Sequence, residues 1–328
     1  MKGKKTNEIF LLIIFIVIIC GLGSLLIKDR FGHSYQTTDD RPNLWIWNPT
    51  EYNSTKWSSF YSRSNNTYVP DYIKMCIETV KRHCSAHFNI HILNQTNIKK
   101  YLPNCVLKDL SKQNSQFSYD ILISSILAKY GGIWMPSSTI VLKNLMPLYS
   151  HIVDNGFFLG GFSCDSDEYF CLNSDNPDRA IFIAPRQSPI IHEWRKYLSL
   201  LKDNSQNDYT FNKRGLHTLK KVIKKFPSKI HLFDASMNGT RDCRLKLIGA
   251  DSLLSSNIGS LANPKSLYLL NFDRNTIKNN HRHNWFEKAS ADDILHSTLW
   301  FTLLYRASMG LNIKLDENVV GKSQTRNS

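Results

Sequence analysis

The sequence predicts an α/β domain built on a Rossmann-like mixed sheet, preceded by an N-terminal transmembrane helix. Three observations lead to this fold class. Short apolar runs of strand length alternate with amphipathic helical stretches, two adjacent glycines join one helix directly to a strand, and residues 9–27 form a continuous apolar segment. Because no repeat or internal linker interrupts the alternation, we expect a single domain over residues 43–310 and a polar tail over residues 311–328.

The N-terminal segment has the length of a membrane span. Residues 9–27 are uncharged and mostly apolar, enough for one helix across a bilayer, and the lysines of MKGKK precede them. This charge bias predicts a cytosolic tail over residues 1–8 and a domain on the far side of the membrane. A cleaved signal peptide with a site near Gly21-Leu22-Gly23 is the alternative. The apolar run continues past that site, so we predict an uncleaved single-pass type II signal-anchor with a stem over residues 28–42.

Charge and composition narrow the possible partners. Lys and Arg number 41 against 27 Asp and Glu, which gives a net charge of +14. The positive residues are scattered in pairs rather than gathered in one arm, and no zinc-finger spacing or RNA-binding aromatic motif is present. We therefore expect a diffuse basic surface and no nucleic-acid partner.

The cysteines fit an oxidising compartment. Cys164 and Cys171 bracket a short acidic loop and are the best candidates for a disulfide. Cys76 and Cys84 fall on one predicted helix, about 12 Å apart, which is too far to bridge. Asn-x-Ser/Thr sequons, at Asn53, Asn65, Asn94 and Asn238, are compatible with a lumenal glycoprotein.

Each element of the domain follows from a local pattern. Residues 44–47 form an apolar strand ended by Asn48-Pro49, and Pro70 opens a helix in its first turn. Residues 88–92 alternate between apolar and polar side chains, as in a half-buried strand. The other expected elements are short helices at 96–102 and 106–111, a helix at 118–130, strands at 133–135, 157–159 and 180–184, a helix around 188–202, a basic helix near 213–225, strands at 230–233 and 267–270, and a final helix at 291–308.

The glycine pair lies between the helix at 118–130 and the strand at 133–135. Tyr119, Leu122 and Ile126 belong to the apolar stripe of this helix, whereas Asp120 lies on its polar side. Gly131 fits the left-handed residue that ends a helix, and Gly132 lets the chain turn straight into the strand.

Several segments resemble one known family. VPDYIKMCIETVKRHC (69–84), HFNIHILNQTNIKKYLP (87–103), SYDILISSILAKYGGIWM (118–135), IVLKNLMPLY (140–149) and IFIAPRQSPIIHEWRKYL (181–198) follow one another in this order. Together they resemble the sugar-transferase family that carries the Asp-x-Asp motif, and particularly its capsular polysaccharide synthesis branch. The resemblance covers roughly residues 43–200 and fades beyond them.

The resemblance implies a fold, a reaction and a place in the cell. It implies the glycosyltransferase-A-like fold and transfer of a hexose from a nucleotide sugar to a glycan or polysaccharide acceptor. With the signal-anchor it implies a domain in the Golgi or ER lumen, or outside the cell. It does not identify a catalytic residue. The donor-binding residues that it implies are Asp120, Tyr130, Gly131, Gly132, Trp134, Ser137 and Ser138, with Asp120 on the nucleotide and the serines facing the diphosphate.

The sequence departs from the family pattern where the metal would be bound. Carboxylates at the end of a strand normally hold Mg or Mn, which neutralises the charge that develops on the departing nucleotide. This chain has Pro136-Ser137-Ser138 in place of Asp-x-Asp or Asp-x-Thr, and Ile123 in place of the family's arginine. Metal-dependent transfer in the usual manner is therefore not predicted.

Three explanations of this departure remain open. Cationic side chains or helix N-termini can carry the phosphate charge without a metal. Asp165 and Asp167 form an Asp-x-Asp elsewhere in the chain and can substitute as metal ligands, although a solvated acidic loop is the better interpretation of them. The third explanation is a non-catalytic relative that binds a sugar or a partner.

Two further groups allow more than one interpretation. Trp45, Trp47 and Trp134 can stack on a sugar or base, or pack in the sheet core. His281 and His283 can contact phosphate or metal, or belong to a surface loop.

Overall fold

The computed structural model describes residues 40–49, 51–52, 67–103, 116–163, 181–203, 218–239, 248–256, 266–272 and 274–311. The chain divides into two units, residues 1–41 and residues 42–328, and all the elements below belong to the second unit. The strands are β1 (Asn43–Trp47), β2 (Glu51–Tyr52), β3 (Thr67–Tyr68), β4 (Asn89–Leu93), β5 (Gly132–Pro136), β6 (Thr139–Val141), β7 (Leu159–Phe162), β8 (Phe182–Ala184), β9 (Ile230–Phe233) and β10 (Leu269–Asn271). The α-helices are α2 (Asp71–Cys84), α3 (Gln116–Tyr130), α4 (Met146–Asp154), α5 (Pro189–Asp203), α7 (Ala250–Leu253), α8 (Arg274–Asn279), α9 (Ala291–His296) and α10 (Trp300–Ser308). Residues 218–225 are also helical, and the 3-10 helices are η3 (Ile98–Lys100), η5 (Pro227–Lys229), η6 (Ala235–Asn238) and η7 (Asn284–Glu287).

The main sheet is mixed, as the sequence predicts. Its six strands lie in the order β4-β1-β5-β8-β7-β9. β4, β1 and β5 run parallel, β8 is antiparallel to both of its neighbours, and β7 and β9 are again parallel to each other. Two short antiparallel pairs, β10 with β6 and β2 with β3, complete the described strands.

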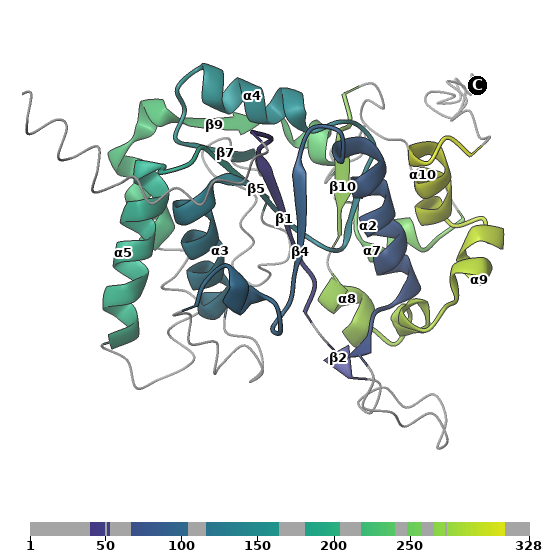
Figure 1. Ribbon diagram of the computed structural model, residues 1–328. Helices are drawn as coiled ribbons and strands as arrows, with labels where there is room; N and C mark the ends of the chain where they lie inside the picture. Colours follow the sequence, from purple (N-terminus) through teal and green to yellow (C-terminus); the bar gives the residue numbers. More distant parts are fainter. Residues whose placement is uncertain are drawn as a thin grey trace, which may run out of the picture. The chain divides into compact units, whose positions relative to one another are not determined.

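Helices cover both faces of this sheet, and each face has its own hydrophobic core. Alternate residues of a strand point to opposite faces, so Leu44 and Ile46 pack in the core with α2, whereas Trp45 and Trp47 pack in the core with α3 and α5. Figure 1 shows α2 on one side of the strands and α3 and α5 on the other. The two stripes of β1 are both fully apolar, which is typical of a strand buried on both faces.

The structure confirms most of the predicted elements and corrects others. β1, α2, β4, α3, β5, α5 and β9 lie within a few residues of their predicted bounds. The predicted strand at 157–159 begins two residues later, as β7. β6 and α4 were not predicted, because three apolar residues after Pro136-Ser137-Ser138 and a helix of nine residues give only weak periodic signals.

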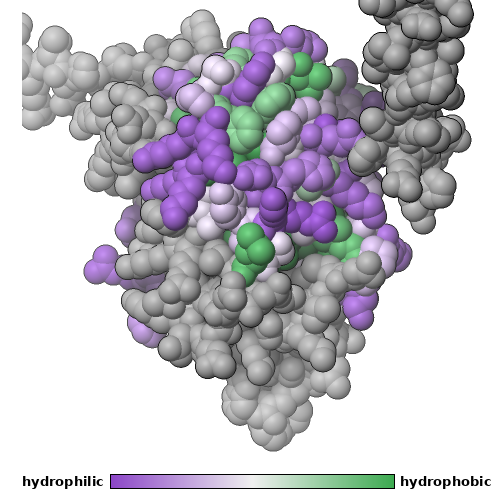
Figure 2. Space-filling model, turned by 90° about the vertical axis from the view of Figure 1, so that its left-hand side faces the viewer, coloured by the Kyte–Doolittle hydropathy of each residue, from purple (hydrophilic) through white to green (hydrophobic). Residues whose placement is uncertain are grey.

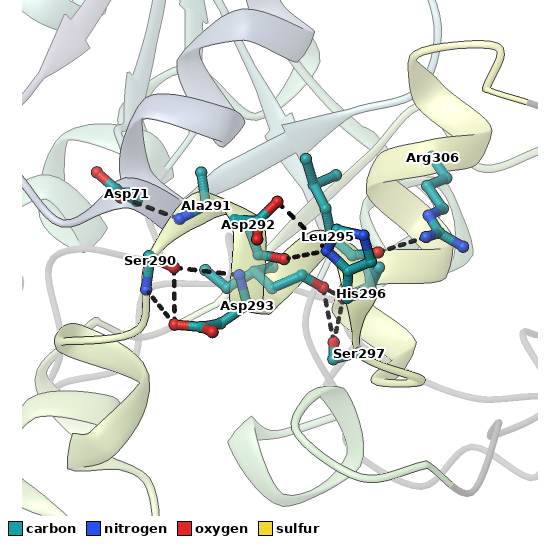
Figure 3. Close-up of polar contacts among 11 residues, drawn as sticks. Asp71, Ser290, Ala291, Asp292, Asp293, Leu295, His296, Ser297 and Arg306 are labelled. Atoms are coloured by element: carbon teal, nitrogen blue, oxygen red, sulfur yellow. Dashed lines mark hydrogen bonds and ion pairs between the residues drawn. The ribbon is translucent and has the colours of Figure 1, made fainter.

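The final helix predicted at 291–308 is two helices. α9 ends at His296 and α10 begins at Trp300, with Ser297 in extended conformation between them. Figure 3 shows how α9 is held at both ends. Ser290 and Asp293 form a capping box, the Asp71 carboxylate accepts a hydrogen bond from the Ala291 N–H, and the Arg306 guanidinium donates to the Leu295 carbonyl.

Steric constraints explain why both residues of the pair are glycines. Both residues have positive φ, +64° at Gly131 and +107° at Gly132. A Cβ at Gly132 would lie 2.1 Å from the Asn43 carbonyl oxygen, and a Cβ at Gly131 would lie 2.5 Å from the Arg186 backbone nitrogen. Glycine is therefore required for β5 to start directly beside β1 and the turn after β8.

Several predictions fall outside the described residues: the tail at 1–8, the span at 9–27, nearly all of the stem, the helix at 106–111, the loop with Cys164 and Cys171, and residues 312–328. Within the described ranges, no helix has the length and apolar character needed to cross a bilayer. Cys76 and Cys84 are both free and buried, which confirms that they do not pair.

We predict that Gly132→Ala strongly destabilises the domain. The positive φ alone costs about 1–3 kcal/mol for a residue with a side chain, and the new Cβ must also displace the Asn43 backbone. Urea unfolding followed by tryptophan fluorescence measures the loss.

Gly156→Ala is the matched control for this substitution. Gly156 shares a positive φ, +65°, but the nearest atom to its Cβ would be the flexible Lys229 Nζ at 3.9 Å. It should cost only about 1–2 kcal/mol. Equal losses in the two variants would show that the contact with Asn43 is not what requires glycine.

Candidate functional site

β1 and β5 end side by side, and this pair of strand ends is the candidate site. Trp47, the last residue of β1, is in register with Pro136, the last residue of β5. One residue further, the Ser137 N–H donates to the Trp47 carbonyl at 3.2 Å. The residues that follow the two strands, Asn48 and Ser137, therefore lie at a common edge of the sheet.

The chain path marks this edge as a ligand site. From β1 the chain crosses through α2 to β4 on one side, and it returns through α3 to β5 on the other side. The strand order thus reverses between β1 and β5. In open α/β sheets, ligands bind outside the carboxyl ends of the strands at such a switch point.

Asp120 belongs to the same region. The Trp47 indole N–H donates to the Tyr119 hydroxyl at 2.8 Å, which joins the end of β1 to the first turns of α3. Asp120 follows Tyr119 and is only 5% exposed. The structure therefore brings Asp120 and the strand ends into one neighbourhood.

Ser137 and Ser138 differ in what their hydroxyls do. The Ser138 hydroxyl donates to the Phe272 carbonyl at 2.7 Å, and the Ser138 carbonyl accepts from the Phe272 N–H at 3.2 Å. The Ser137 hydroxyl makes no hydrogen bond with any residue that the structure describes. Ser138 thus fixes the C-terminal segment against the end of β5, whereas the Ser137 hydroxyl is available to a ligand.

Asn48 is a candidate residue that the sequence pattern did not reveal. Its backbone N–H donates to the Leu93 carbonyl at 2.9 Å, which holds it at the end of β1. Its side-chain oxygen is buried, and no donor among the described residues reaches it. A buried acceptor without a donor costs free energy that a ligand N–H or O–H can offset. In the sequence, an Asn that follows an apolar run and precedes a proline indicates only a turn. The pattern therefore did not mark Asn48 as a binding residue.

Four other residues predicted to bind the donor lie elsewhere or serve the core. Tyr130, Gly131 and Gly132 stand where β5 begins, about 16 Å along the strand from Ser137. The Tyr130 hydroxyl donates to the Tyr101 carbonyl at 3.0 Å, and the glycines face Asn43 and Arg186. These contacts within the protein explain the three residues without any ligand. That they also contact the donor stays a prediction.

The tryptophans pack in the core. Trp134 is 2% exposed and stacks on Trp47, with ring centroids 6.5 Å apart. Trp45 stacks on His91 at 4.2 Å and donates to the Gly131 carbonyl at 2.8 Å. Of the two interpretations of these rings, packing is therefore the one that the geometry supports.

A buried ion pair fixes the segment that follows Phe272. The Arg274 side chain contacts the Glu287 carboxylate through Nε at 3.2 Å and Nη2 at 3.4 Å, and both residues are at most 7% exposed. The Tyr72 hydroxyl donates to the same carboxylate, and the Tyr68 hydroxyl donates to the Glu287 carbonyl. Burial, reinforced by the Glu287 charge, raises the pKa of Tyr72 well above its usual value, so the phenol remains a donor.

The remaining polar candidates do not gather into a metal site within the described ranges, where no group of three or more His, Cys, Asp or Glu could hold an ion. His283 is buried and bonded through Nε2 to the Asp251 carboxylate at 2.8 Å, whereas His281 is exposed. Asp165 and Asp167 lie outside the described residues.

We predict that Glu287→Gln costs about 3–5 kcal/mol of stability, because it leaves the Arg274 charge buried without a counter-charge. Replacing the pair together, as Arg274→Met with Glu287→Leu, should cost less than the single change, since no buried charge then remains. Urea unfolding of both variants gives the comparison. A double variant less stable than the single one would mean that the charges themselves, rather than their pairing, are required.

Three solved glycosyltransferases show a weak structural likeness to this chain. A glycosyltransferase involved in glycosylation of the major capsid protein of PBCV-1 has 12% identity and a TM-score of 0.39, over 70% of this chain and 94% of that one. Mouse xyloside xylosyltransferase 1 has 11% identity and a TM-score of 0.35, over 61% and 87%. The galactosyltransferase LgtC, solved with donor and acceptor sugar analogues, has 10% identity and a TM-score of 0.36, over 84% and 98%. At TM-scores this low we draw no conclusion from these likenesses.

The family comparison is stronger. No curated protein matches the chain. The family described as capsular polysaccharide synthesis protein matches residues 28–238, which is more than half of the chain and includes β1, α3, β5 and the candidate site. On this match, the chain belongs to the capsular polysaccharide synthesis protein family.

Proposed function

We propose that this protein is a glycosyltransferase that moves a hexose from a nucleotide sugar to a glycan or polysaccharide acceptor. The chain belongs to a capsular polysaccharide synthesis family, and its sequence motifs resemble those of sugar transferases. The observation that carries the proposal is the switch point between β1 and β5. There Asn48 offers a buried acceptor without a donor, Ser137 offers a hydroxyl, and Asp120 lies close along α3.

In this proposal the residues of the site bind and orient the donor. The Asp120 carboxylate accepts hydrogen bonds from the ribose or base, and Asn48 accepts a further one. The Ser137 hydroxyl donates to the diphosphate as the sugar–phosphate bond breaks and negative charge grows on the nucleotide. Donors that are held in place before the reaction stabilise such charge more than mobile water does.

The end of β5 does not fit a divalent cation. Mg and Mn prefer several oxygen ligands, with carboxylates among them. Residues 136–138 provide two neutral hydroxyls, and the hydrogen of one already bonds to Phe272. Among the described residues nearby, Arg274 carries a positive charge, but Glu287 neutralises it. We therefore propose transfer without a metal at this strand end.

The proposal includes a membrane anchor at residues 9–27. Its support is the length and apolar character of that segment, with lysines before it. The anchor is of the single-pass type II kind, and the domain then lies in the Golgi or ER lumen or outside the cell.

We expect the purified full-length protein to bind a nucleotide sugar and release its nucleotide equally with and without Mn. A panel of UDP- and GDP-sugars, read by thermal shift and by nucleotide release, tests this. Asp120→Asn should weaken donor binding about ten- to a hundredfold, because it removes hydrogen bonds to a charged acceptor.

Each result of the panel has a definite meaning. Release that requires Mn contradicts the metal-free proposal. A donor-dependent thermal shift without any release favours the other candidate, a non-catalytic binding protein on the same scaffold, which the missing carboxylates at 136–138 make a specific possibility. A shift that survives Asp120→Asn unchanged removes Asp120 from the site.

Asn48→Leu separates binding from folding. Leucine has nearly the same shape but no polar atoms, so the ligand-free protein should be as stable as the wild type or more so, because a buried acceptor without a donor has been removed. Donor affinity should fall about fivefold or more. Unfolding by urea and donor titration measure the two effects, and an unchanged affinity would exclude Asn48 from the donor site.

A further inference from the structure

Trp285 is an aromatic side chain that the fold leaves at the surface. It lies in η7 and is 46% exposed. The other tryptophans that the structure describes are at most 4% exposed: Trp45, Trp47, Trp134, Trp194 and Trp300. A single exposed apolar residue needs no explanation by itself. Two further observations, the place of Trp285 in the fold and the way in which its turn is held, point to a role for this one.

Trp285 lies at the edge of the sheet where β1 ends. Because α2 connects β1 to the parallel strand β4, it runs back along the sheet, and its first turn lies at that edge. The Tyr68 and Tyr72 hydroxyls, at the start of α2, both donate to Glu287. Glu287 is two residues after Trp285, so the ring belongs to the same edge. Figure 1 shows α8, which contacts η7, at this end of α2.

A second set of contacts joins the turn of Trp285 to the candidate donor site. The Ser138 hydroxyl, just beyond the end of β5, donates to the Phe272 carbonyl at 2.7 Å. Arg274 follows two residues later and pairs with the Glu287 carboxylate at 3.2 Å. Trp285 is thus connected to the end of β5 through one hydrogen bond and one ion pair. A ligand on this ring would lie at the same edge of the sheet as the donor.

Buried residues hold this turn in place. Burying a charged pair costs desolvation free energy, so the Arg274–Glu287 pair is weak evidence of a purely stabilising role. It does fix a geometry, because the Glu287 carboxylate accepts hydrogen bonds from both Arg274 and Tyr72. Phe286, next to Trp285, is fully buried and stacks on Tyr72, with ring centroids 4.9 Å apart. A side chain on such a rigid support loses little freedom when a ligand binds, which favours binding.

Two cationic side chains accompany the ring. Lys288 lies three residues after Trp285, the spacing at which side chains eclipse in a 3-10 helix, and Arg282 lies three residues before it. Both are exposed. Neither forms an ion pair with a residue in the described part of the chain, so their N–H groups are available as hydrogen-bond donors.

An aromatic ring with hydrogen-bond donors beside it fits a sugar ring better than a protein surface. A pyranose has C–H groups that pack on an aromatic face and hydroxyls that need hydrogen-bond partners. A protein interface needs an apolar core of several residues. The other exposed large apolar residues that the structure describes are scattered over α4, α5 and the segment after α10: Val153, Leu200 and Leu311. Figure 2 shows the side of α5, where apolar residues are interspersed among hydrophilic ones.

We propose that Trp285 binds the glycan acceptor: a sugar ring stacks on the indole, and Arg282 and Lys288 donate to its hydroxyls. The inference rests on the proposed function, since a glycan bound here is an acceptor only if the protein is a transferase. The family match ends at residue 238 and assigns no role to this turn. In this arrangement the segment after β10 binds the acceptor, and the ends of β1 and β5 bind the donor at the same edge of the sheet.

Fluorine NMR of the full-length protein labelled with 5-fluorotryptophan tests the proposal on the wild type. The probes are cellohexaose, chitohexaose, mannohexaose and a hexasaccharide of polygalacturonate, each titrated without a nucleotide sugar. We expect at least one probe to shift the Trp285 resonance, which is assigned by its absence from Trp285→Phe, and to leave the resonances of the buried tryptophans unchanged. If no probe shifts the Trp285 resonance, the proposal is wrong.

Variants of the turn give the contribution of each side chain, measured by calorimetric titration with the bound probe. Trp285→Ala should weaken binding about tenfold, because it removes the stacking surface. Trp285→Phe keeps an aromatic face and should weaken it less than about threefold. Arg282→Ala together with Lys288→Ala should weaken it about fivefold through the lost hydrogen bonds.

Matched controls lie on another side of the domain. Leu200→Ala removes an exposed apolar side chain of α5, and Arg195→Ala with Lys224→Ala removes one exposed Arg and one exposed Lys. Both controls should bind the probe as the wild type does. Urea unfolding of every variant shows that a lost affinity does not come from a lost fold.

The remaining outcomes separate this inference from the transferase proposal. An affinity that Trp285→Ala leaves unchanged, or that the controls reduce equally, overturns the inference, whatever the nucleotide release. Glycan binding through Trp285 without nucleotide release from any donor supports the binding site and contradicts the transferase. A raised KM for the nucleotide sugar in Arg282→Ala with Lys288→Ala, with the glycan affinity unchanged, assigns these cations to the donor diphosphate and overturns their place in the acceptor site.

Discussion

The close parallel approach of β1 and β5 is the constraint on which the rest of the site depends. Gly131 and Gly132 both have a positive φ, and Gly132 has no Cβ, so β5 can begin against the Asn43 backbone. That register then carries Trp47 and Pro136 to the same level and leaves Asn48 and Ser137 adjacent. A shift of β5 by one residue at its start would move every side chain of the strand to the opposite face of the sheet, including those at its end. The glycines thus influence the candidate site from the far end of the strand.

The sequence is most informative where one local pattern determines one element. The alternation of β4, the apolar run of β1 and the stripe of α3 were predictable because burial on a sheet or helix face imposes a period. The break between α9 and α10 was not, because Ser297 interrupts an otherwise helical pattern without a proline or glycine. The apolar run at 267–270 predicted β10, but its partner β6 was missed, because three residues show no period of their own and the pairing joins Ile140 to Leu270 across 130 residues.

The candidate site was predictable in its location more than in its members. The resemblance led to the end of β5 and to α3, and it also predicted donor contacts for Gly131, Gly132 and Trp134, whose contacts within the protein only coordinates reveal. It also treated Ser137 and Ser138 alike, although only the second is committed to Phe272. Asn48 could not have been found from sequence, because its interest lies in the lack of a neighbouring donor, and only coordinates show neighbours.

The hydrogen bonds between Ser138 and Phe272 also bear on where the domain ends. The family match stops at residue 238, yet β10, α8 and the Glu287 network all come later in the chain and pack against α2 and the end of β5. Leu269, Phe286 and Phe301 belong to the same hydrophobic core as Leu44 and Ile73. A chain shortened to the matched region would lose the packing of α9, α10 and η7 against α2. The described elements that follow residue 248 are thus an integral part of the fold rather than an appendage to the matched region.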